Sequence, residues 1–246
     1  MVKLDIELKY LSLLISLFIM PAYLFAGEYL HVITENWKPY NYEENGEIKG
    51  DSSENVIKVL ERAGIDYGIN VYPWSRVYKM GLNNKNTLIY TLVRMPVREP
   101  LFNWARPILD TEFSSLYRLK ARSDVQVSSL NEAIKYKIGV IKDSMNYYYF
   151  LSRGFNDVLV PVSTDHTQNV IDLLQGDVEL MASSDKHFSY AVKKIGVSEA
   201  LFEKVWPLFE IHPYMAFSHD TSQELVDRVN RAYDELVEEG AIKRFE

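Results

Sequence analysis

The chain has 246 residues and no cysteine. This absence excludes disulfide bonds, thiolate metal sites, a cysteine nucleophile and a lipid-attached N-terminal cysteine. The motifs of serine hydrolases, zinc proteases and nucleotide-binding P-loops are also missing. We therefore expect no cofactor, no metal ion and no catalytic residue. The histidines show no metal-ligand spacing, and we interpret each as a surface or packed residue: His31, His166, His187, His212 and His219.

Positive charge is in the minority. The chain carries 27 Lys+Arg against 34 Asp+Glu, so its formal net charge is −7. Nucleic acid calls for a basic face, so this composition disfavours such a partner, although a local basic patch remains compatible with the total. Hydrophobic residues make up 47% of the chain and aromatic residues 13%, which excludes disorder as a general description.

The chain has one long apolar run, at residues 10–26, and Pro21 interrupts it. A membrane-spanning helix needs about 20 apolar residues, so this run is short for one. We interpret residues 1–26 as a secretory signal peptide with Ala26 at the cleavage position. An uncleaved anchor and a buried helix are the alternatives. An exported chain without cysteine suits a bacterial periplasm, where free thiols risk oxidation.

The remaining chain alternates strand-like and helix-like patterns. The first half predicts strands at 29–34, 66–71 and 87–93, with helices at 51–63 and 75–82 between them. Asp51 and Ser52 are the expected caps of the first helix. This order predicts a parallel sheet with helices on its faces, an α/β fold.

The second half repeats the alternation. Helices are expected at 129–135, 144–153, 164–174 and 185–195, and strands at 137–141, 158–162 and 179–182. Ser129 and Glu132 form a capping-box pattern. Extended segments at 111–119 and 214–218 are expected to join two α/β lobes into a hinged clamp, and a last helix covers 222–239.

Ligand sites in open α/β sheets lie beyond the carboxyl ends of the strands. Large aromatic side chains follow two of these ends: Trp37 and Tyr40 after the first strand, and Trp74 after the second. Aromatic rings offer large contact areas at low entropy cost, so they are candidate walls for a ligand. Packing within their own lobe is the competing interpretation.

Three arginines occur at the same ends. Arg76 stands in the first turn of a helix, where the helix dipole disfavours a cation, and Arg94 and Arg98 flank a proline turn after the third strand. A guanidinium group fits a carboxylate, so one of these residues is expected to bind an acidic group of a ligand. The alternatives are a solvated side chain for Arg76 and ion pairs with neighbours such as Glu99 for the other two.

The other strand ends carry smaller polar residues. Ser144 begins a helix whose free N–H groups face the end of a strand, although an ordinary helix cap explains it as well. Asp185 follows another strand and is more readily explained as a cap than as a ligand contact. Glu35 and Thr91 complete the candidates at these ends, and Glu35 is also the one acid/base candidate.

Together these motifs resemble one known family. The order Glu35-x-Trp-x-Pro-Tyr40, Gly50 before a helix, Pro73-Trp-Ser-Arg76, Arg94-Met-Pro-Val-Arg98-Glu, Phe102-x-Trp, Pro107 and Glu239-Gly-Ala-Ile-Lys243 is similar to that of the family 3 periplasmic solute-binding proteins. These proteins are receptors of polar-amino-acid-type ABC importers. The Pro-Trp-x-Arg motif is typical of a poorly defined subgroup.

The resemblance implies a two-lobed, type II periplasmic-binding-protein-like fold with two hinge crossovers. Residues 27–112 and 212–246 would form lobe 1, and residues 113–211 lobe 2, with hinge strands at its edges. Arg98 stands where the family binds a ligand carboxylate. Trp37 and Trp74 fall on its aromatic walls. The acid that pairs with the amino group of an amino-acid ligand is replaced by Ser184, so an acidic or polar ligand of another kind becomes plausible.

We therefore expect a non-catalytic, monomeric receptor that captures a small polar, acidic molecule in the cleft for an ABC permease. One alternative is a sensor that acts through a membrane partner. The other is a dehydratase-like enzyme on the same fold, for which Glu35 has no convincing catalytic partner in the sequence.

Overall fold

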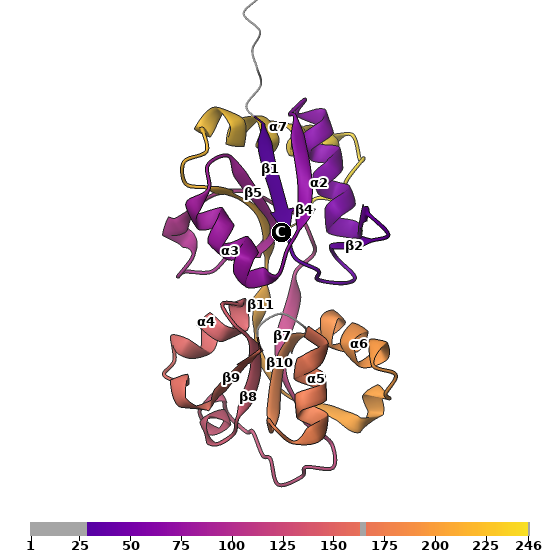
Figure 1. Cartoon of the computed structure of the whole chain (residues 1–246), viewed down its shortest axis with the longest axis vertical. Coiled ribbons are helices and arrows are strands. Elements are labelled where there is room, and N and C mark those ends of the chain that lie inside the picture. The colour runs from indigo at the N-terminus through magenta and orange to yellow at the C-terminus, as the bar shows by residue number, and fades with distance from the viewer. Residues whose placement is uncertain (1–28, 163–165, 246) are drawn as a thin grey trace, which may run out of the picture.

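The computed structural model describes residues 29–162 and 166–245 and consists of two lobes, one above the other in Figure 1. The predicted two-lobed α/β fold is thereby confirmed. The predicted signal peptide at residues 1–26 lies outside the described residues. None of the helices in the described ranges combines the length and the apolar character needed to cross a bilayer.

Lobe 1, as we use the term, is built on a five-stranded sheet in the order β4-β1-β5-β12-β6. Strand β1 pairs in parallel with β4 and β5, and β12 pairs antiparallel with β5 and β6. The elements of lobe 1 are β1 (Leu30–Thr34), β2 (Tyr42–Glu44), β3 (Glu47–Lys49), α2 (Asp51–Arg62), β4 (Tyr67–Val71), α3 (Trp74–Asn83), β5 (Thr87–Val93), η1 (Glu99–Leu101), β6 (Phe102–Pro107), β12 (Pro213–Ser218) and α7 (Gln223–Glu238).

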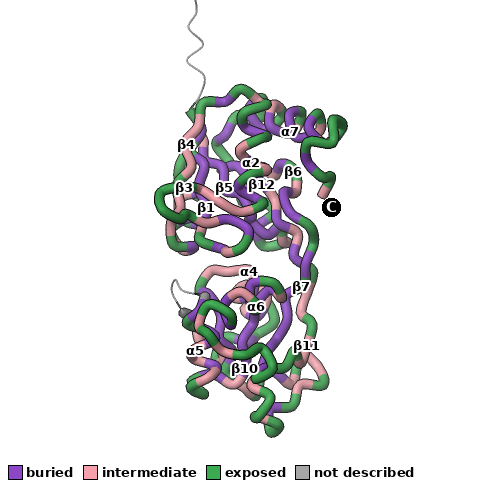
Figure 2. The backbone as a smooth tube through the Cα atoms, turned by 90° about the vertical axis from the view of Figure 1, so that its right-hand side faces the viewer, coloured by how far each residue is buried: buried purple, intermediate pink, exposed green. Residues whose placement is uncertain are grey.

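The alternation along β5 divides the core of lobe 1 into two layers. Leu88 and Tyr90 pack on one face with the apolar sides of α2 and α7, and Ile89 packs on the other with α3. Successive side chains of a strand point to opposite faces, so one buried strand serves both layers. The buried strands and the exposed outer faces of the helices are visible in Figure 2.

Lobe 2 is built on a second five-stranded sheet in the order β11-β7-β10-β8-β9. Helix α4 and the turn η2 pack on one face of this sheet, and α5 and α6 pack on the other. The elements of lobe 2 are β7 (Glu112–Leu119), η2 (Leu130–Lys135), β8 (Ile138–Ile141), α4 (Met145–Leu151), η3 (Asn156–Val158), β9 (Leu159–Val162), α5 (His166–Gln175), β10 (Leu180–Ser184), α6 (Asp185–Lys194), η4 (Glu199–Leu201) and β11 (Phe202–Ile211).

Two strands carry the chain between the lobes. Strands β7 and β11 pair antiparallel along their whole length, and β7 leads from lobe 1 into lobe 2 while β11 leads back (Figure 1). The expectation that residues 214–218 form the second connection was wrong, because β12 lies inside the sheet of lobe 1. The true second connection, β11, is bulged between Lys204 and Trp206 and between Pro207 and Phe209, which disturbs the alternation that marks a strand.

Local details differ from the sequence expectation in two further places. The segment after Ser129 forms the 3-10 turn η2, and Glu132 accepts hydrogen bonds from Ser128 in place of the expected capping box. Helix α2 has Gly50 at its N-cap, so neither Asp51 nor Ser52 caps it. By contrast Ser144 and Ser222 cap α4 and α7, each accepting a backbone N–H.

Gly50 fixes the loop that follows β1. Its φ of 104° and ψ of 153° lie in a region that only glycine adopts readily, and a Cβ there would overlap the carbonyl oxygen of Tyr40. The same carbonyl accepts hydrogen bonds from the N–H and the hydroxyl of Ser52, at 3.1 and 2.7 Å. The loop after β1 is therefore tied to the start of α2.

We expect Gly50→Ala to lower the free energy of unfolding by at least about 3 kcal/mol, because backbone strain and a steric clash act together. Gly46→Ala is the matched control. It also has a positive φ, 80°, but a Cβ there would have no atom within 4 Å, so strain alone should cost about 1 kcal/mol. Urea unfolding measures both, and equal losses would contradict the role of the close approach.

Candidate functional site

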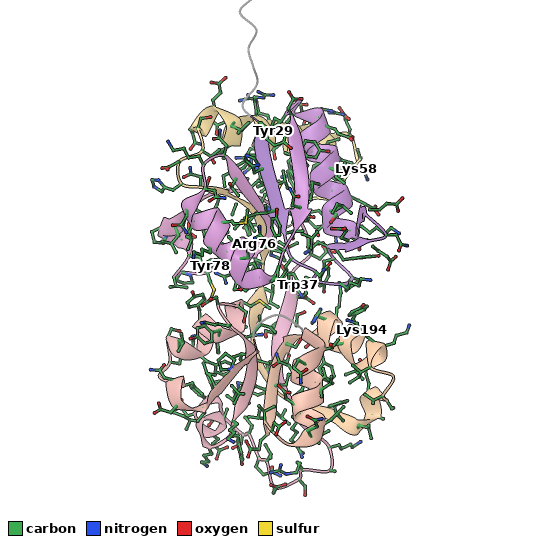
Figure 3. The ribbon with its side chains drawn as sticks, in the orientation of Figure 1. Tyr29, Trp37, Lys58, Arg76, Tyr78 and Lys194 are labelled. Carbon is green, nitrogen blue, oxygen red and sulfur yellow. The ribbon has the colours of Figure 1, made fainter. Side chains whose placement is uncertain are left out.

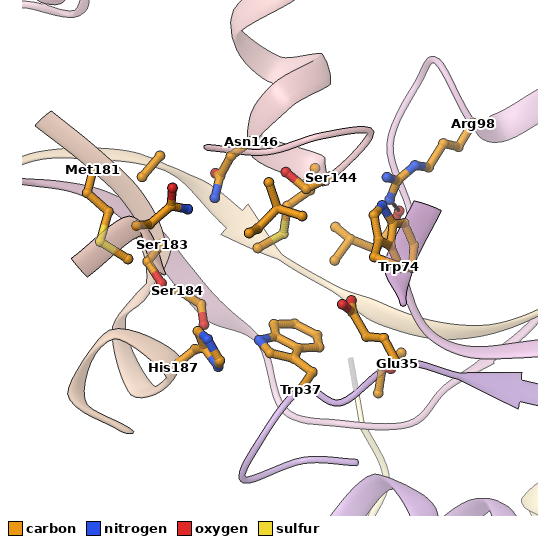
Figure 4. Close-up of a pocket in the computed structure, with 16 residues that line it drawn as sticks. Glu35, Trp37, Trp74, Arg98, Ser144, Asn146, Met181, Ser183, Ser184 and His187 are labelled. Atoms are coloured by element: carbon orange, nitrogen blue, oxygen red, sulfur yellow. Dashed lines mark hydrogen bonds between the residues drawn. The ribbon is translucent and has the colours of Figure 1, made fainter. Parts of the chain in front are cut away.

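A cavity lies between the lobes, where the ends of β1, β5, β8 and β10 approach one another (Figure 4). Its water-accessible space is about 50 Å³. Both lobes supply its wall. Lobe 1 contributes Glu35, Trp37, Trp74, Thr91, Val93 and Arg98, and lobe 2 contributes Ile141, Ser144, Met145, Asn146, Asn169, Met181, Ala182, Ser183, Ser184 and His187.

Trp37 forms the wall of the cavity on the side of the first loop. Its ring lies at the boundary between the lobes (Figure 3) and packs edge-to-face on Tyr40, with 4.9 Å between the ring centres. The neighbouring Lys38 carbonyl accepts a hydrogen bond from Nδ1 of His187, 2.9 Å away in lobe 2. The loop that carries Trp37 is thus held from both lobes.

Tyr40 does not line the cavity, but its ring packs against the ring of Trp37, which does. Its hydroxyl donates a hydrogen bond to Oε2 of Glu112, at 2.7 Å, and Glu112 is the first residue of β7. The Glu112 carboxylate also faces the backbone N–H of Lys186 in α6. Burial raises the pKa of Glu112, and burial together with the Glu112 charge raises the pKa of Tyr40.

Thr91 reaches the cavity through an unusual backbone. It has a φ of 61°, in the left-handed region that a β-branched residue rarely adopts, although it belongs to β5. The partner strand β12 has a register shift between Tyr214 and Ala216 at this point. Such strain costs about 1–3 kcal/mol and is found most often at functional sites.

Arg98 is almost fully buried, with 1% of its surface exposed. Nη1 donates to the carbonyl of Val93 in lobe 1 and Nη2 to the carbonyl of Asp143 in lobe 2, both at 3.1 Å. Among the described residues, none accepts a hydrogen bond from Nε. Burial lowers the pKa of Arg98, an effect that the nearby Tyr78 opposes, but arginine stays charged at such sites.

Lobe 2 offers amide and hydroxyl groups. Asn146 is 5% exposed, and its Oδ1 accepts a hydrogen bond from Ser114 at 2.6 Å. This contact leaves Nδ2 directed into the cavity, as Figure 4 shows. Ser144 accepts the N–H of Tyr147 with its oxygen, so its own O–H is available as a donor. Gly139 leaves space beside it for the side chain of Asn169.

The acid at the end of β10 points away from the cavity. Asp185 accepts hydrogen bonds from Ser115 at 2.9 Å and Tyr117 at 2.6 Å, and it forms an ion pair with Lys204. These donors lower the pKa of Asp185 although its burial acts in the opposite direction. Ser184, one residue earlier, lines the cavity instead.

The model of one protein family, the bacterial extracellular solute-binding proteins of family 3, matches residues 30–246. The chain belongs to this family. The predicted membership is therefore confirmed, whereas the Pro-Trp-x-Arg subgroup stays a prediction. Family 3 proteins are extracytoplasmic receptors, which places this protein outside the cytoplasm. No curated protein sequence matches the chain.

Solved structures share the fold of this family 3 protein at low sequence identity. A histidine kinase sensor domain with similarity to periplasmic binding proteins has a TM-score of 0.77 at 15% identity and covers 87% of this chain and 92% of its own. A mutant of ArgBP from T. maritima has a TM-score of 0.71 at 16% sequence identity and covers 87% of this chain and 91% of its own. ArtJ from Geobacillus stearothermophilus, an arginine-, lysine-, histidine-binding protein, has a TM-score of 0.72 at 15% sequence identity. It also covers 87% of this chain and 91% of its own.

In the structure of this family 3 protein, the candidate site residues predicted from the sequence fall into two groups. Seven of them line the cavity: Glu35, Trp37, Trp74, Thr91, Arg98, Ser144 and Ser184. Four lie outside it: Tyr40 and Asp185, as described above, and the exposed arginines Arg76 and Arg94.

The two exposed arginines have partners of their own. The Arg76 guanidinium lies 4.0 Å from the centre of the Tyr72 ring. Arg94 forms two hydrogen bonds with the carboxylate of Glu99, at 2.9 and 2.5 Å, and thus makes the ion pair that the alternative interpretation described.

Sequence reasoning missed several cavity residues. Asn146 stood two residues after Ser144, inside a segment already singled out, but an amide carries little pattern of its own. Asn169 lies in the middle of α5, where nothing in the sequence distinguishes it. Met145, Met181 and His187 were interpreted as ordinary packing or surface residues or were passed over.

The raised pKa of Glu112 predicts how the stability of the protein depends on pH. A carboxyl group with a raised pKa in the folded state adds stability below its unfolded pKa, near 4.5, and that stability is lost as the pH rises through the folded value. We expect Glu112→Gln to flatten this loss. Tyr40→Phe should steepen it, because the Tyr40 hydroxyl stabilises the charged carboxylate.

Urea unfolding at a series of pH values from 4.5 to 7.5 measures this dependence. The two variants serve as each other's control, since their expected effects have opposite signs. A wild-type protein whose stability relative to Glu112→Gln rises with pH would contradict the assignment.

Proposed function

We propose that this protein is an extracytoplasmic receptor that captures a small polar molecule carrying an acidic group. One observation carries the proposal: a cavity between two lobes, with aromatic walls at Trp37 and Trp74 and polar donors from both sides. Hinge closure would remove the bound molecule from water, which strengthens each polar contact inside.

The donors around the cavity favour an acidic ligand. Asn146 Nδ2, the Ser144 hydroxyl and Arg98 Nε each have an N–H or O–H to offer. Glu35 is the one carboxylate in the lining, and its charge opposes the lowering of the Arg98 pKa that burial causes. Since these two charges balance each other, a ligand anion adjacent to the free donors is not opposed by a net negative wall.

The size of the cavity favours a small ligand. A space of about 50 Å³ holds a few water-sized groups. A sugar chain or a peptide would therefore prevent the lobes from closing this far. We propose a molecule of the size of an amino acid or a short organic acid.

We further propose that the receptor is a periplasmic monomer, exported by the signal peptide at residues 1–26, and that it delivers its ligand to an ABC permease without chemical change. The family description and the binding proteins among the similar structures support this. As in the sequence-based expectation, residues 27–112 with 212–246 would move as one body and residues 113–211 as the other.

A sensor that signals through a membrane partner is the second candidate. The histidine kinase sensor domain has a TM-score of 0.77, above the 0.71 and 0.72 of the two receptor structures reported with it. Uptake of the identified ligand by living cells separates the two functions. Deleting the gene should abolish high-affinity uptake for a transport receptor and leave it intact for a sensor.

A thermal-shift screen with small acids, amino acids, amines and sugars tests the ligand class. A ligand at 100 times its dissociation constant should add about 2.7 kcal/mol of stability. We expect acids to stabilise the wild-type protein. Stabilisation by amines or sugars alone would contradict the acidic ligand.

Asn146→Asp sharpens this test. The new carboxylate keeps the contact with Ser114 but brings a negative charge to the cavity, so binding of an acid should weaken by about 100-fold or more. Asn156→Asp, on the exposed turn η3, is the control with the same change in net charge. Tighter binding by Asn146→Asp would show that the ligand is a cation.

A further inference from the structure

The loop between β8 and α4 presents a single backbone carbonyl to lobe 1. Asp143 has a φ of 59°, unusual for a residue other than glycine, and its carbonyl accepts two hydrogen bonds. Trp74 Nε1 donates at 2.8 Å and Arg98 Nη2 donates at 3.1 Å. Both donors belong to lobe 1, whereas Asp143 belongs to lobe 2, so both bonds cross the boundary between the lobes.

Aromatic rings from both lobes surround the same guanidinium group. The centre of the Arg98 guanidinium lies 5.2 Å from the Trp74 ring, 5.1 Å from the Tyr78 ring and 5.7 Å from the Tyr148 ring. Tyr148 belongs to α4 of lobe 2, and its ring centre lies 6.0 Å from that of Tyr78. Opening the lobes would separate Arg98 from one ring and one carbonyl at once.

We propose that the Asp143 carbonyl, Trp74 and Arg98 form a latch that holds the lobes closed. All its atoms belong to the chain, so it stabilises the closed form whatever the cavity contains. The latch rests on the proposed function in one respect, namely that the lobes open to admit a ligand. It assigns Trp74 and Arg98 a positioning role in closure, in addition to their place in the cavity wall.

The latch changes what Arg98 can do for a ligand. Its two terminal nitrogens each donate to a carbonyl, of Val93 and of Asp143, so two of its five N–H groups are engaged within the chain. Nε is the one guanidinium nitrogen of Arg98 that has no acceptor among the described residues. The acidic group of a ligand would therefore share Arg98 with these two carbonyls and also meet Asn146 and Ser144 of lobe 2, while the same arginine helps to close the lobes over it.

Because the chain has no cysteine, spin labels can be attached at two chosen sites without a background signal. Lys58 on α2 and Lys194 on α6 are exposed and belong to different lobes (Figure 3). We would label the Lys58→Cys, Lys194→Cys protein with nitroxide at both positions and add no ligand. Pulsed electron–electron double resonance then measures the distance between the lobes.

We expect a closed population in the ligand-free protein, and we expect Trp74→Phe to lower its closed-to-open ratio by about 2- to 10-fold. That variant removes one hydrogen bond and keeps the aromatic ring. Trp104→Phe is the matched control, because Trp104 Nε1 donates to the Glu99 carbonyl within lobe 1, at 3.2 Å. Arg98→Lys should open the lobes further, since one ammonium group cannot replace the guanidinium fork.

Urea unfolding of each variant shows whether the fold is intact, so a change in lobe distance at an unchanged unfolding midpoint reports the latch alone. The latch is overturned if the ligand-free protein shows the open distance only. It is equally overturned if Trp74→Phe and Arg98→Lys leave the distances unchanged, or if Trp104→Phe shifts them as far as Trp74→Phe. Because no ligand is added, these outcomes are independent of the thermal-shift screen.

Discussion

The antiparallel ribbon of β7 and β11 is the constraint on which the other features depend. Both passages of the chain between the lobes run through it, and the two strands hydrogen-bond to each other along their length. A paired ribbon can bend or twist far more easily than it can stretch or shear, because shear would break its ladder of bonds. The lobes therefore keep their strand ends facing one another, and the cavity residues of each lobe meet a defined set from the other.

Two of the four non-glycine residues with a positive φ in the described part of the chain lie where the lobes meet. Thr91 in β5 and Asp143, two residues after β8, both adopt positive φ without being glycine. Thr91 places a hydroxyl residue in the cavity wall, and Asp143 directs its carbonyl to Trp74 and Arg98. Strain of this kind persists only where surrounding contacts hold it, and here the buried strands of two cores do so.

The sequence predicted the periodic elements well because their patterns are local. Helix α7 followed from its apolar stripe and Ser222, and the parallel strands from short apolar runs between helices. Strand β11 was missed because its bulges and Pro207 hide the alternation. The residue pattern alone did not show which arginine reaches the cavity, although the family resemblance pointed to Arg98. Arg94 and Arg98 are chemically equal there, and only the fold shows that Glu99 pairs with the first while the second turns inward.

Ser184 and Asp185 are adjacent in the chain but lie on opposite sides of the end of β10. Three donors hold the carboxylate of Asp185 on its own side, so no small movement brings it across. A descendant of this protein that came to prefer a positively charged molecule could not use Asp185 and would need a new acid in the cavity wall, for example at position 184. A change of ligand charge would therefore require a substitution in the wall itself, because the neighbouring aspartate is held on the other side of the strand.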